Sequence, residues 1–526
     1  MINKTLSAIR SSFLLCATRP SKPRFPGRSR LLFALSPSRD AMAALRKLAI
    51  GGLYALCPMR FFVYALCAML VLGMLGCQAV MSTVKPPLEE EGEIYLYLQP
   101  LPQEANRLRF TVEKIFAVSS DGREFALDVY VHELKGPDMK RQRLLASGRV
   151  PPGSYGGLSF QVKNAILKVE DGEATLRSPE EPVRIDFPFN VARKKAYLIS
   201  SRFKYPESIR GTFSFIPAFS MFIPGKPLAN VAGYVTNPGS SNITVFDKQA
   251  GLAVAIIATG RKPMGMALDQ KLKRAYVALS GDDAIDMVDV VAEDVIDRIR
   301  LNTGDHPQEL ALTPDNKLLL AVNPGSNTLS FIDATSRLEV KRIKVGNGPN
   351  SVLIDSTGRR AYVFNTVSST VSVIDIPNKM LLTTIGTDPS PLRGQFNRSG
   401  DKIYVIHEWS SYVSVIDPLS LSVTRRFQVR MGMQSIKVDT NTDLVYLGRK
   451  NDTVVEAYDP FSFVPVDFIN TGGGISYMTI DGEGNNLTMV NPGSKTLVGA
   501  SLISKKTVFI IDVGESPNWV TMMGER

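Results

Sequence analysis

Side chains that commonly perform catalysis or bind metals are scarce in this chain. Its 526 residues include only three histidines, His132, His306 and His407, and four cysteines. The sequence contains no CxxCH pattern for covalent haem, no zinc-ligand or EF-hand spacing, and no glycine-rich phosphate loop between a strand and a helix. We therefore predict no metal, no cofactor and no catalytic residue set.

The better candidates interrupt a regular pattern of short strands. One position of this pattern is occupied in turn by Gly265, Glu309, Ser351, Arg393, Ser435, Tyr477 and Trp519. The position two residues later is occupied by Ala267, Ala311, Leu353, Gln395, Lys437, Thr479 and Thr521. If both positions face one channel, its wall has a polar set and an aromatic side. The candidate ligand contacts there are Glu309, Arg393, Gln395, Lys437, Tyr477 and Trp519.

A second group of candidates lies in one turn. His407, Glu408, Trp409 and Tyr412 stand where the corresponding turns are rich in Ser and Asn. A Trp–Tyr pair at an exposed turn suits recognition of a protein or a sugar, because these rings combine a large apolar surface with a polar group. Packing of the two rings between neighbouring sheets is the alternative interpretation.

The elements that must position these residues repeat about every 42 residues. An aspartate that closes an apolar triplet marks each unit, with gaps of 42, 44, 42, 42 and 42 between the markers Asp247, Asp289, Asp333, Asp375, Asp417 and Asp459. Each unit reads as four short β-rich runs separated by turn residues. Such a period built from strands predicts the blades of a β-propeller. The aspartate is expected to accept backbone N–H groups of the turn that follows it.

The strand count predicts a closed ring. Seven second strands begin near Tyr234 and continue to Leu487, and seven first strands begin near Pro263 and end with the run from Pro517. The C-terminal segment should therefore supply the innermost strand of the blade that begins at Tyr234, which would remove open sheet edges. The seventh unit departs most, because Ser501 replaces the marker aspartate.

The units resemble the bacterial YVTN propeller repeat. The tetrapeptide of that name stands here as Tyr234-Val235-Thr236-Asn237, and the matching positions hold Tyr276-Val277-Ala278, Tyr362-Val363-Phe364-Asn365, Tyr404-Val405-Ile406-His407 and Tyr446-Leu447-Gly448. The resemblance covers residues 229–524 and implies the fold rather than an activity, since propellers host many functions. We expect a seven-bladed propeller over residues 229–526.

The region before the propeller is also predicted to be all β. Residues 94–98, 110–115 and 125–131 are rich in aromatic and β-branched residues, which favours strands. The segment 150–162 resembles the Pro-Gly-x-Tyr turn and strand of transthyretin-like sandwiches, an element also found in a lipoprotein domain of unknown function, and Tyr155 is expected to be a core residue. We predict a small β-sandwich of about seven strands over residues 93–222.

The net charge of +11 belongs to the first part of the chain. Residues 1–76 contain 11 Lys and Arg and one acid, Asp40, whereas the other 450 residues contain 50 basic and 49 acidic residues. Nucleic-acid binding therefore loses its support, because no basic stripe remains.

The basic leader ends in a secretory signal. Sixteen uncharged, mostly apolar residues, 61–76, follow Arg60, as in a signal peptide. Met74-Leu75-Gly76-Cys77 resembles the bacterial lipobox, which implies cleavage before Cys77 and acylation of its thiol. Residue 78 is Gln rather than the aspartate that retains such lipoproteins at the inner membrane, so the resemblance implies the outer membrane. Residues 1–76 would be the leader, with Met59 a possible true start, and residues 77–92 the lipidated N-terminus and tether.

Two other interpretations of the leader remain open. The apolar run could be an uncleaved membrane helix, although it is short for the roughly 20 residues that a span needs. The composition of residues 1–58 also fits an organellar transit peptide, which would not explain the lipobox.

These features predict a lipid-anchored cell-envelope protein, periplasmic or surface-exposed, whose propeller is a rigid, non-catalytic binding platform. Its partners would be the membrane, through the lipid, and an envelope protein or glycan. The alternative is a propeller enzyme of the lactonase-like or cofactor-bearing type, with Glu309, Arg393, His407 and Glu408 converging at the channel mouth. That alternative requires these side chains to lie within reach of one substrate.

Overall fold

The computed structural model describes residues 84–170, 172–211 and 213–525. Almost all regular structure in these residues is β-strand, which confirms the predicted all-β class. Residues 82–526 belong to one compact unit. The leader and residues 77–83 of the tether, among them the predicted lipidation site Cys77, lie outside the described residues. No helix in the described part of the chain is long and apolar enough to cross a membrane.

Ten strands of the first region form one hydrogen-bonded sheet, in the order β12-β9-β1-β5-β3-β2-β6-β7, with β4 paired to β2 and β8 paired to β6. These strands are β1 (Gly92–Leu98), β2 (Leu108–Ser119), β3 (Glu124–Val129), β4 (Glu133–Lys135), β5 (Arg143–Val150), β6 (Gly153–Val169), β7 (Gly172–Thr175), β8 (Val183–Val191), β9 (Ala196–Phe203) and β12 (Phe219–Phe222). The smaller elements are η1 (Gln103–Arg107), η2 (Gly136–Asp138), α4 (Tyr205–Ser208), the hairpin of β10 (Ile209–Arg210) and β11 (Ser214–Phe215), and η3 (Ala229–Val231). The runs predicted at 94–98, 110–115 and 125–131 correspond to β1, β2 and β3, whereas the transthyretin-like arrangement stays a prediction.

Strand β1 is buried on both faces, which its apolar run from Ile94 to Leu98 anticipates. Successive side chains of a strand point to opposite faces. Ile94, Leu96 and Leu98 enter the core of the first sheet, and Tyr95 and Tyr97 enter a second core shared with the propeller. Tyr155 is buried and stacks on Phe189, so its predicted core role is confirmed.

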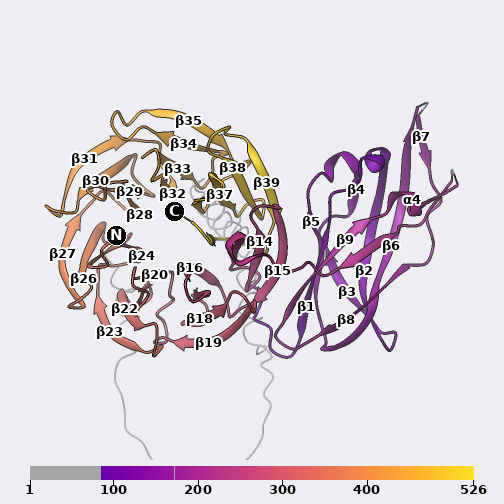
Figure 1. Ribbon diagram of the computed structural model, residues 1–526, viewed down its shortest axis with the longest axis horizontal. Helices are drawn as coiled ribbons and strands as arrows, with labels where there is room; N and C mark the ends of the chain where they lie inside the picture. The colour runs from indigo at the N-terminus through magenta and orange to yellow at the C-terminus, as the bar shows by residue number, and fades with distance from the viewer. Residues whose placement is uncertain (1–83, 171, 212, 526) are drawn as a thin grey trace, which may run out of the picture. The chain divides into compact units, whose positions relative to one another are not determined.

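The propeller has seven blades, each an antiparallel sheet of four strands, arranged around a central axis (Figure 1). Six blades are continuous in sequence. Blade 2 is β16 (Pro263–Asp269), β17 (Arg274–Leu279), β18 (Ala284–Asp289) and β19 (Asp294–Arg300); blade 3 is β20 (Glu309–Leu312), β21 (Leu318–Asn323), β22 (Thr328–Asp333) and β23 (Glu339–Lys344); blade 4 is β24 (Pro349–Ile354), β25 (Arg360–Asn365), β26 (Thr370–Asp375) and β27 (Met380–Gly386). Blade 5 is β28 (Pro391–Phe396), β29 (Ile403–His407), β30 (Tyr412–Asp417) and β31 (Ser422–Gln428); blade 6 is β32 (Met433–Val438), β33 (Val445–Arg449), β34 (Val454–Tyr458) and β35 (Pro465–Asn470); blade 7 is β36 (Tyr477–Asp481), β37 (Asn486–Asn491), β38 (Thr496–Ser501) and β39 (Thr507–Asp512).

Blade 1 closes the ring with strands from both ends of the propeller. It contains β13 (Ala232–Asn237), β14 (Asn242–Asp247) and β15 (Leu252–Ala258), and its innermost strand is β40 (Trp519–Met522). Strand β40 pairs antiparallel with β13, from Trp519 opposite Thr236 to Met522 opposite Gly233. The predicted seven blades and the predicted closure by the C-terminal strand are both confirmed.

The marker aspartates act as the sequence predicts. The Oδ1 atom of Asp247 accepts the backbone N–H groups of Gln249 and Ala250, both at 2.8 Å. These bonds favour the ionised carboxylate, so the pKa values of the equivalent Asp333, Asp375, Asp417 and Asp459 are lowered. In blade 7 the Oγ atom of Ser501 accepts two N–H groups of its own turn at 3.2 Å, so the substitution preserves the turn.

The first sheet packs against the blades that flank the closure. The carboxylate of Asp512, at the end of β39, accepts hydrogen bonds from Arg141, from Arg143 Nε at 2.8 Å and from the backbone N–H of Leu144 at 3.1 Å. The side-chain amide of Gln142 pairs with both backbone groups of Ala253 in β15. Because these polar bonds surround the apolar cluster that contains Tyr95 and Tyr97, the first sheet is docked on blades 1 and 7.

A buried ion pair clamps the same closure. Lys248 follows β14, and its Nζ atom lies 2.7 Å from Asp481 in blade 7 and 2.9 Å from the backbone oxygen of Met523. The side chains of Lys248 and Asp481 are 2% and 5% exposed. One charged group therefore joins blade 1, blade 7 and the C-terminal segment.

We predict that Lys248→Ala destabilises the protein by about 3–5 kcal/mol, because a buried carboxylate loses its cation. The matched control is Lys495→Ala, which removes the half-exposed pair of Lys495 with Glu515 and should cost under about 1 kcal/mol. Urea unfolding measures both. Equal losses in the two variants would contradict the clamp.

Candidate functional site

The first strands of the blades line the central channel. Strands β16, β20, β24, β28, β32, β36 and β40 contact one another in ring order. The turn between the second and third strands of each blade and the loop that leads into each first strand lie at one end of the ring, because neighbouring strands are antiparallel. We call this end the entry face.

Four of the predicted channel residues form one cluster. The guanidinium of Arg393 lies 2.8 Å from the carboxylate of Glu309. It also covers the rings of Tyr477 and Trp519, with its Cζ atom 4.7 and 4.9 Å from their centroids. These two rings are stacked at 3.6 Å. The cluster thus joins blades 1, 3, 5 and 7 across the channel, with cation–π contacts supplementing the ion pair.

Burial controls the ionisation of this cluster. Desolvation raises the pKa of Glu309 to about 7, although Arg393 and the N–H group of Val352 favour the charged form. The pKa of Tyr477 is also raised by burial. Glu309 can therefore exchange a proton near neutrality, as a general acid or base must. Arg393, however, covers the aromatic rings that a ligand would use for stacking.

The remaining channel candidates lie two residues further along their strands. Gln395 and Lys437 are half-buried there. At the same level, the hydroxyls of Thr479 and Thr521 donate to the carboxylate of Glu525, at 3.2 and 2.8 Å. Sequence reasoning missed Glu525. This residue lies beyond the last strand, and no repeat position predicts the path of the chain there.

His407 lies inside blade 5 rather than at the channel cluster. Its Nε2 atom is 3.0 Å from Ser414 Oγ, and burial lowers its pKa to about 4. The equivalent residues Asn237, Asn323 and Asn365 bond in the same way to hydroxyls seven residues later. His407 therefore replaces a structural asparagine. Within residues 84–525, no hydrogen bond or ion pair joins His407 or Glu408 to Glu309 or Arg393.

His407, Ser414 and Asp388 do not form a catalytic triad. The carboxylate of Asp388 accepts a hydrogen bond from Ser414 at 3.1 Å, whereas a triad requires the acid to orient the histidine. Ser414 is fully buried and cannot meet a substrate. The four residues of the enzyme hypothesis are therefore divided between two places.

In blades 1 to 3 the turn between the second and third strands packs closely against the neighbouring loop. A Cβ atom on Gly239 would lie 2.8 Å from Glu515, one on Gly281 would lie 2.7 Å from Arg261, and one on Gly325 would collide with Gly304. Only glycine fits these positions, since each turn touches the loop beside it.

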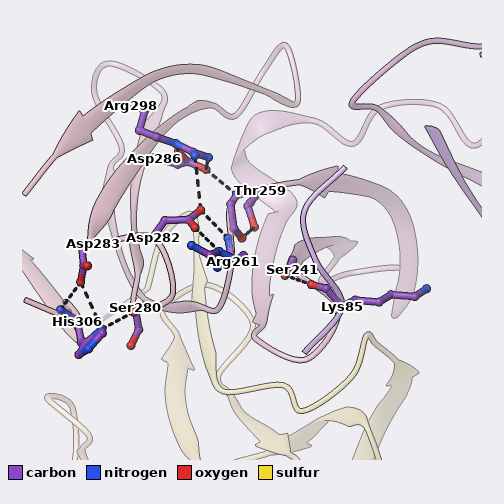
Figure 2. A network of polar contacts seen from close by, with 11 residues as sticks. Lys85, Ser241, Thr259, Arg261, Ser280, Asp282, Asp283, Asp286, Arg298 and His306 are labelled. Carbon is purple, nitrogen blue, oxygen red and sulfur yellow. Dashed lines mark hydrogen bonds and ion pairs between the residues drawn. The ribbon is translucent and has the colours of Figure 1, made fainter. Parts of the chain in front are cut away.

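Polar contacts reinforce this packing around blade 2 (Figure 2). Asp282 accepts the N–H of Arg261 at 2.8 Å, and Asp283 accepts the N–H of His306 at 2.8 Å. The imidazole of His306 also contacts the backbone oxygen of Ser280 at 3.0 Å. His306 is thus an exposed histidine in a loop-stabilising network.

In blades 4 to 6 the same turn position carries side chains instead of glycine. The residues there are Val367, Trp409 and Asn451, and Trp409 is 70% exposed. Beside Trp409 lies a hollow of about 450 Å³, lined by Glu408, Trp409, Met431, Gly432, Gln434, Arg449, Lys450, Asn451 and Asp452. The predicted contacts Glu408 and Trp409 therefore meet at this hollow, whereas Tyr412, 44% exposed, lies on the same turn outside its lining. Sequence reasoning missed Asn451, which shares the repeat position of Trp409.

The fold and its repeat define the class as a seven-bladed β-propeller. Residues 235–443 match a family model described as a YNCE-like β-propeller, which covers less than half of the chain. No curated protein matches the sequence.

Solved structures with a similar fold include a functionally unknown protein from Desulfotomaculum acetoxidans. It is 13% identical, with 55% of this chain and 98% of the other covered at a TM-score of 0.49. Another is the hydrazine synthase of Kuenenia stuttgartiensis, 17% identical, with 54% and 93% covered at a TM-score of 0.44.

We predict that Glu309 makes the stability of the protein depend on pH. Its pKa is about 7 in the folded protein and ordinarily 4.5. The stability that this group contributes is therefore complete below pH 4.5 and is lost as the pH rises to about 7. Glu309→Gln, which resembles the protonated acid, removes the effect. The melting temperature of the variant should rise relative to wild type between pH 5 and pH 8, and a constant difference over this range would contradict the raised pKa.

Proposed function

We propose that this is a lipid-anchored protein of the cell envelope, with repeats that resemble those of YVTN propellers. Its propeller serves as a rigid, non-catalytic platform that binds an envelope component at the entry face of blades 4 to 6. The lipobox resemblance at Cys77 supports the anchor, and the outer membrane is the proposed location.

The rigidity of the platform rests on two features. The ring is closed by the pairing of β40 with β13, and Asp512 and Gln142 join the first sheet to the outer strands of blades 7 and 1. A surface held in this way loses little conformational freedom when a partner binds.

The main observation in favour of this binding site is the exposure of Trp409. Indole is normally buried in soluble proteins, yet this ring is 70% exposed beside a hollow. The equivalent turn positions of blades 1, 2, 3 and 7 are the glycines Gly239, Gly281, Gly325 and Gly493. An exposed tryptophan at a break in the repeat is typical of a recognition residue.

A binding assay with isolated envelopes tests this site. The unit 82–526 should sediment with envelopes from cells that lack the protein, in a saturable manner. Trp409→Ala should abolish this association, because the central aromatic contact is lost. Leu419→Ala is the control, since Leu419 is 87% exposed on the opposite end of blade 5. Unchanged sedimentation of Trp409→Ala would overturn the proposed platform.

The anchor is tested separately. Cys77→Ser in the full chain should abolish labelling by a fatty-acid probe and release the protein from membranes, because the thiol that the lipobox presents for acylation is lost. Labelling that persists in the variant would reject the lipoprotein assignment without affecting the binding site.

A catalytic role of the lactonase-like or cofactor-bearing type is the second candidate, and one observation favours it. Glu309 has a pKa of about 7 and lies in a cluster with Arg393 inside the channel. Residues with such shifted pKa values are common in active sites. His407 lies inside blade 5 and Glu408 lines the hollow, so neither joins this cluster. The binding role is therefore better supported than the catalytic one.

A further inference from the structure

The hollow beside Trp409 has the chemistry of a carbohydrate site. We propose that it binds a saccharide that carries N-acetyl groups, an assignment that rests on the platform function proposed above and names its ligand class. The supporting observations are the exposed indole, the charges of the lining and the two amide side chains among the lining residues.

The indole ring supplies the stacking surface. The C–H groups on one face of a pyranose ring carry small positive charges and pack on the electron-rich face of an aromatic ring. Trp409 is exposed enough for this contact, and the neighbouring Met431 is 60% exposed. The thioether of Met431 extends the apolar side of the hollow, where the methyl group of an acetamido substituent would fit.

The charges of the lining balance. Glu408 and Asp452 are acidic, and Arg449 and Lys450 are basic. Glu456, which pairs with Arg449 at 3.0 Å, also has Arg430 at 3.9 Å, so the charges next to the lining balance as well. A hollow without net charge attracts neither a phosphodiester chain nor an acidic peptide, whereas it suits an uncharged ligand rich in hydroxyl groups.

Two residues with side-chain amides line the same hollow as Trp409. The lining of the hollow includes Gln434, from the first strand of blade 6, and Asn451, from the turn between the second and third strands of the same blade. An amide offers both a donor and an acceptor, which matches the donor and acceptor of an N-acetyl group. A few fixed polar groups opposite an apolar wall are what orient small ligands in concave sites.

The supporting wall of the hollow is rigid. Arg449 is held by Asp452 and Glu456, and the hydroxyl of Tyr458 donates to Glu456 at 3.0 Å. The turn that carries Asn451 is thereby fixed to the third strand of blade 6. At about 450 Å³, the hollow lies within the range of ~300–1,000 Å³ that is common for small-molecule sites.

The two tryptophans allow a direct test. The full chain contains only Trp409 and Trp519, and Trp519 is 7% exposed in the channel. Acrylamide quenching of the intrinsic fluorescence therefore reports mainly on Trp409. The measurement uses the full-length protein in a detergent without sugar headgroups, with chitotetraose as the probe and cellotetraose, which has the same linkage but lacks N-acetyl groups, as the matched control.

Chitotetraose should protect Trp409 from quenching in a saturable manner, and cellotetraose should do so much more weakly. Gln434→Ala should weaken protection by about fivefold to tenfold, as expected for the loss of one or two hydrogen bonds. Tyr412→Ala should leave protection unchanged, because Tyr412 does not line the hollow. Circular dichroism confirms that each variant is folded.

Three results would overturn the inference: equal protection by the two tetrasaccharides, protection by an oligothymidylate instead, or no protection by chitotetraose. If Trp409→Ala abolishes binding to envelopes while chitotetraose gives no protection, the platform function stands and the saccharide assignment fails. If neither assay depends on Trp409, both proposals fail.

Discussion

The pairing of β40 with β13 is the interaction on which the rest of the structure depends. It joins residues almost 300 positions apart, so the free energy of the whole ring must offset a large loss of chain entropy. Once formed, it removes the two open edges that an array of seven units would present. Lys248 and Asp481 clamp the same blades, and the first sheet packs over their outer strands through Asp512. Three contacts thus stabilise the closure: the pairing of β40 with β13 beside the channel, the ion pair of Lys248 with Asp481 at one end of the ring, and the first sheet on the outer strands.

The ring was predictable from sequence because its signal is repeated. Each marker aspartate serves one local turn, and local hydrogen bonds repeat with the sequence. Ser501, which seemed an interruption, performs the same task with its hydroxyl. The packing of the first sheet on the propeller could not be predicted, because Asp512 and Gln142 make contacts that no repeat position encodes.

The candidate site was predictable in part for the same reason. Breaks in the repeat identified Arg393 and Glu309, and the ring brings them together. The same reasoning grouped His407 with them, although a buried histidine can replace a structural asparagine. It also missed Asn451 and Gln434, which are ordinary residues made relevant only by the exposed Trp409 beside them. Departures from the repeat therefore identify candidate site residues in the sequence, whereas only the contacts in the folded protein show which candidates share one site.

The paired strands β13 and β40 should have the same free energy of opening as the rest of the ring. Native-state hydrogen exchange measures this directly, by comparing the amides of β13 and β40 with those of β25 in blade 4. If the closure is integral, the amides of both regions exchange only through global unfolding and share one free energy of opening. Exchange of β13 and β40 through a separate opening of lower free energy would contradict the account.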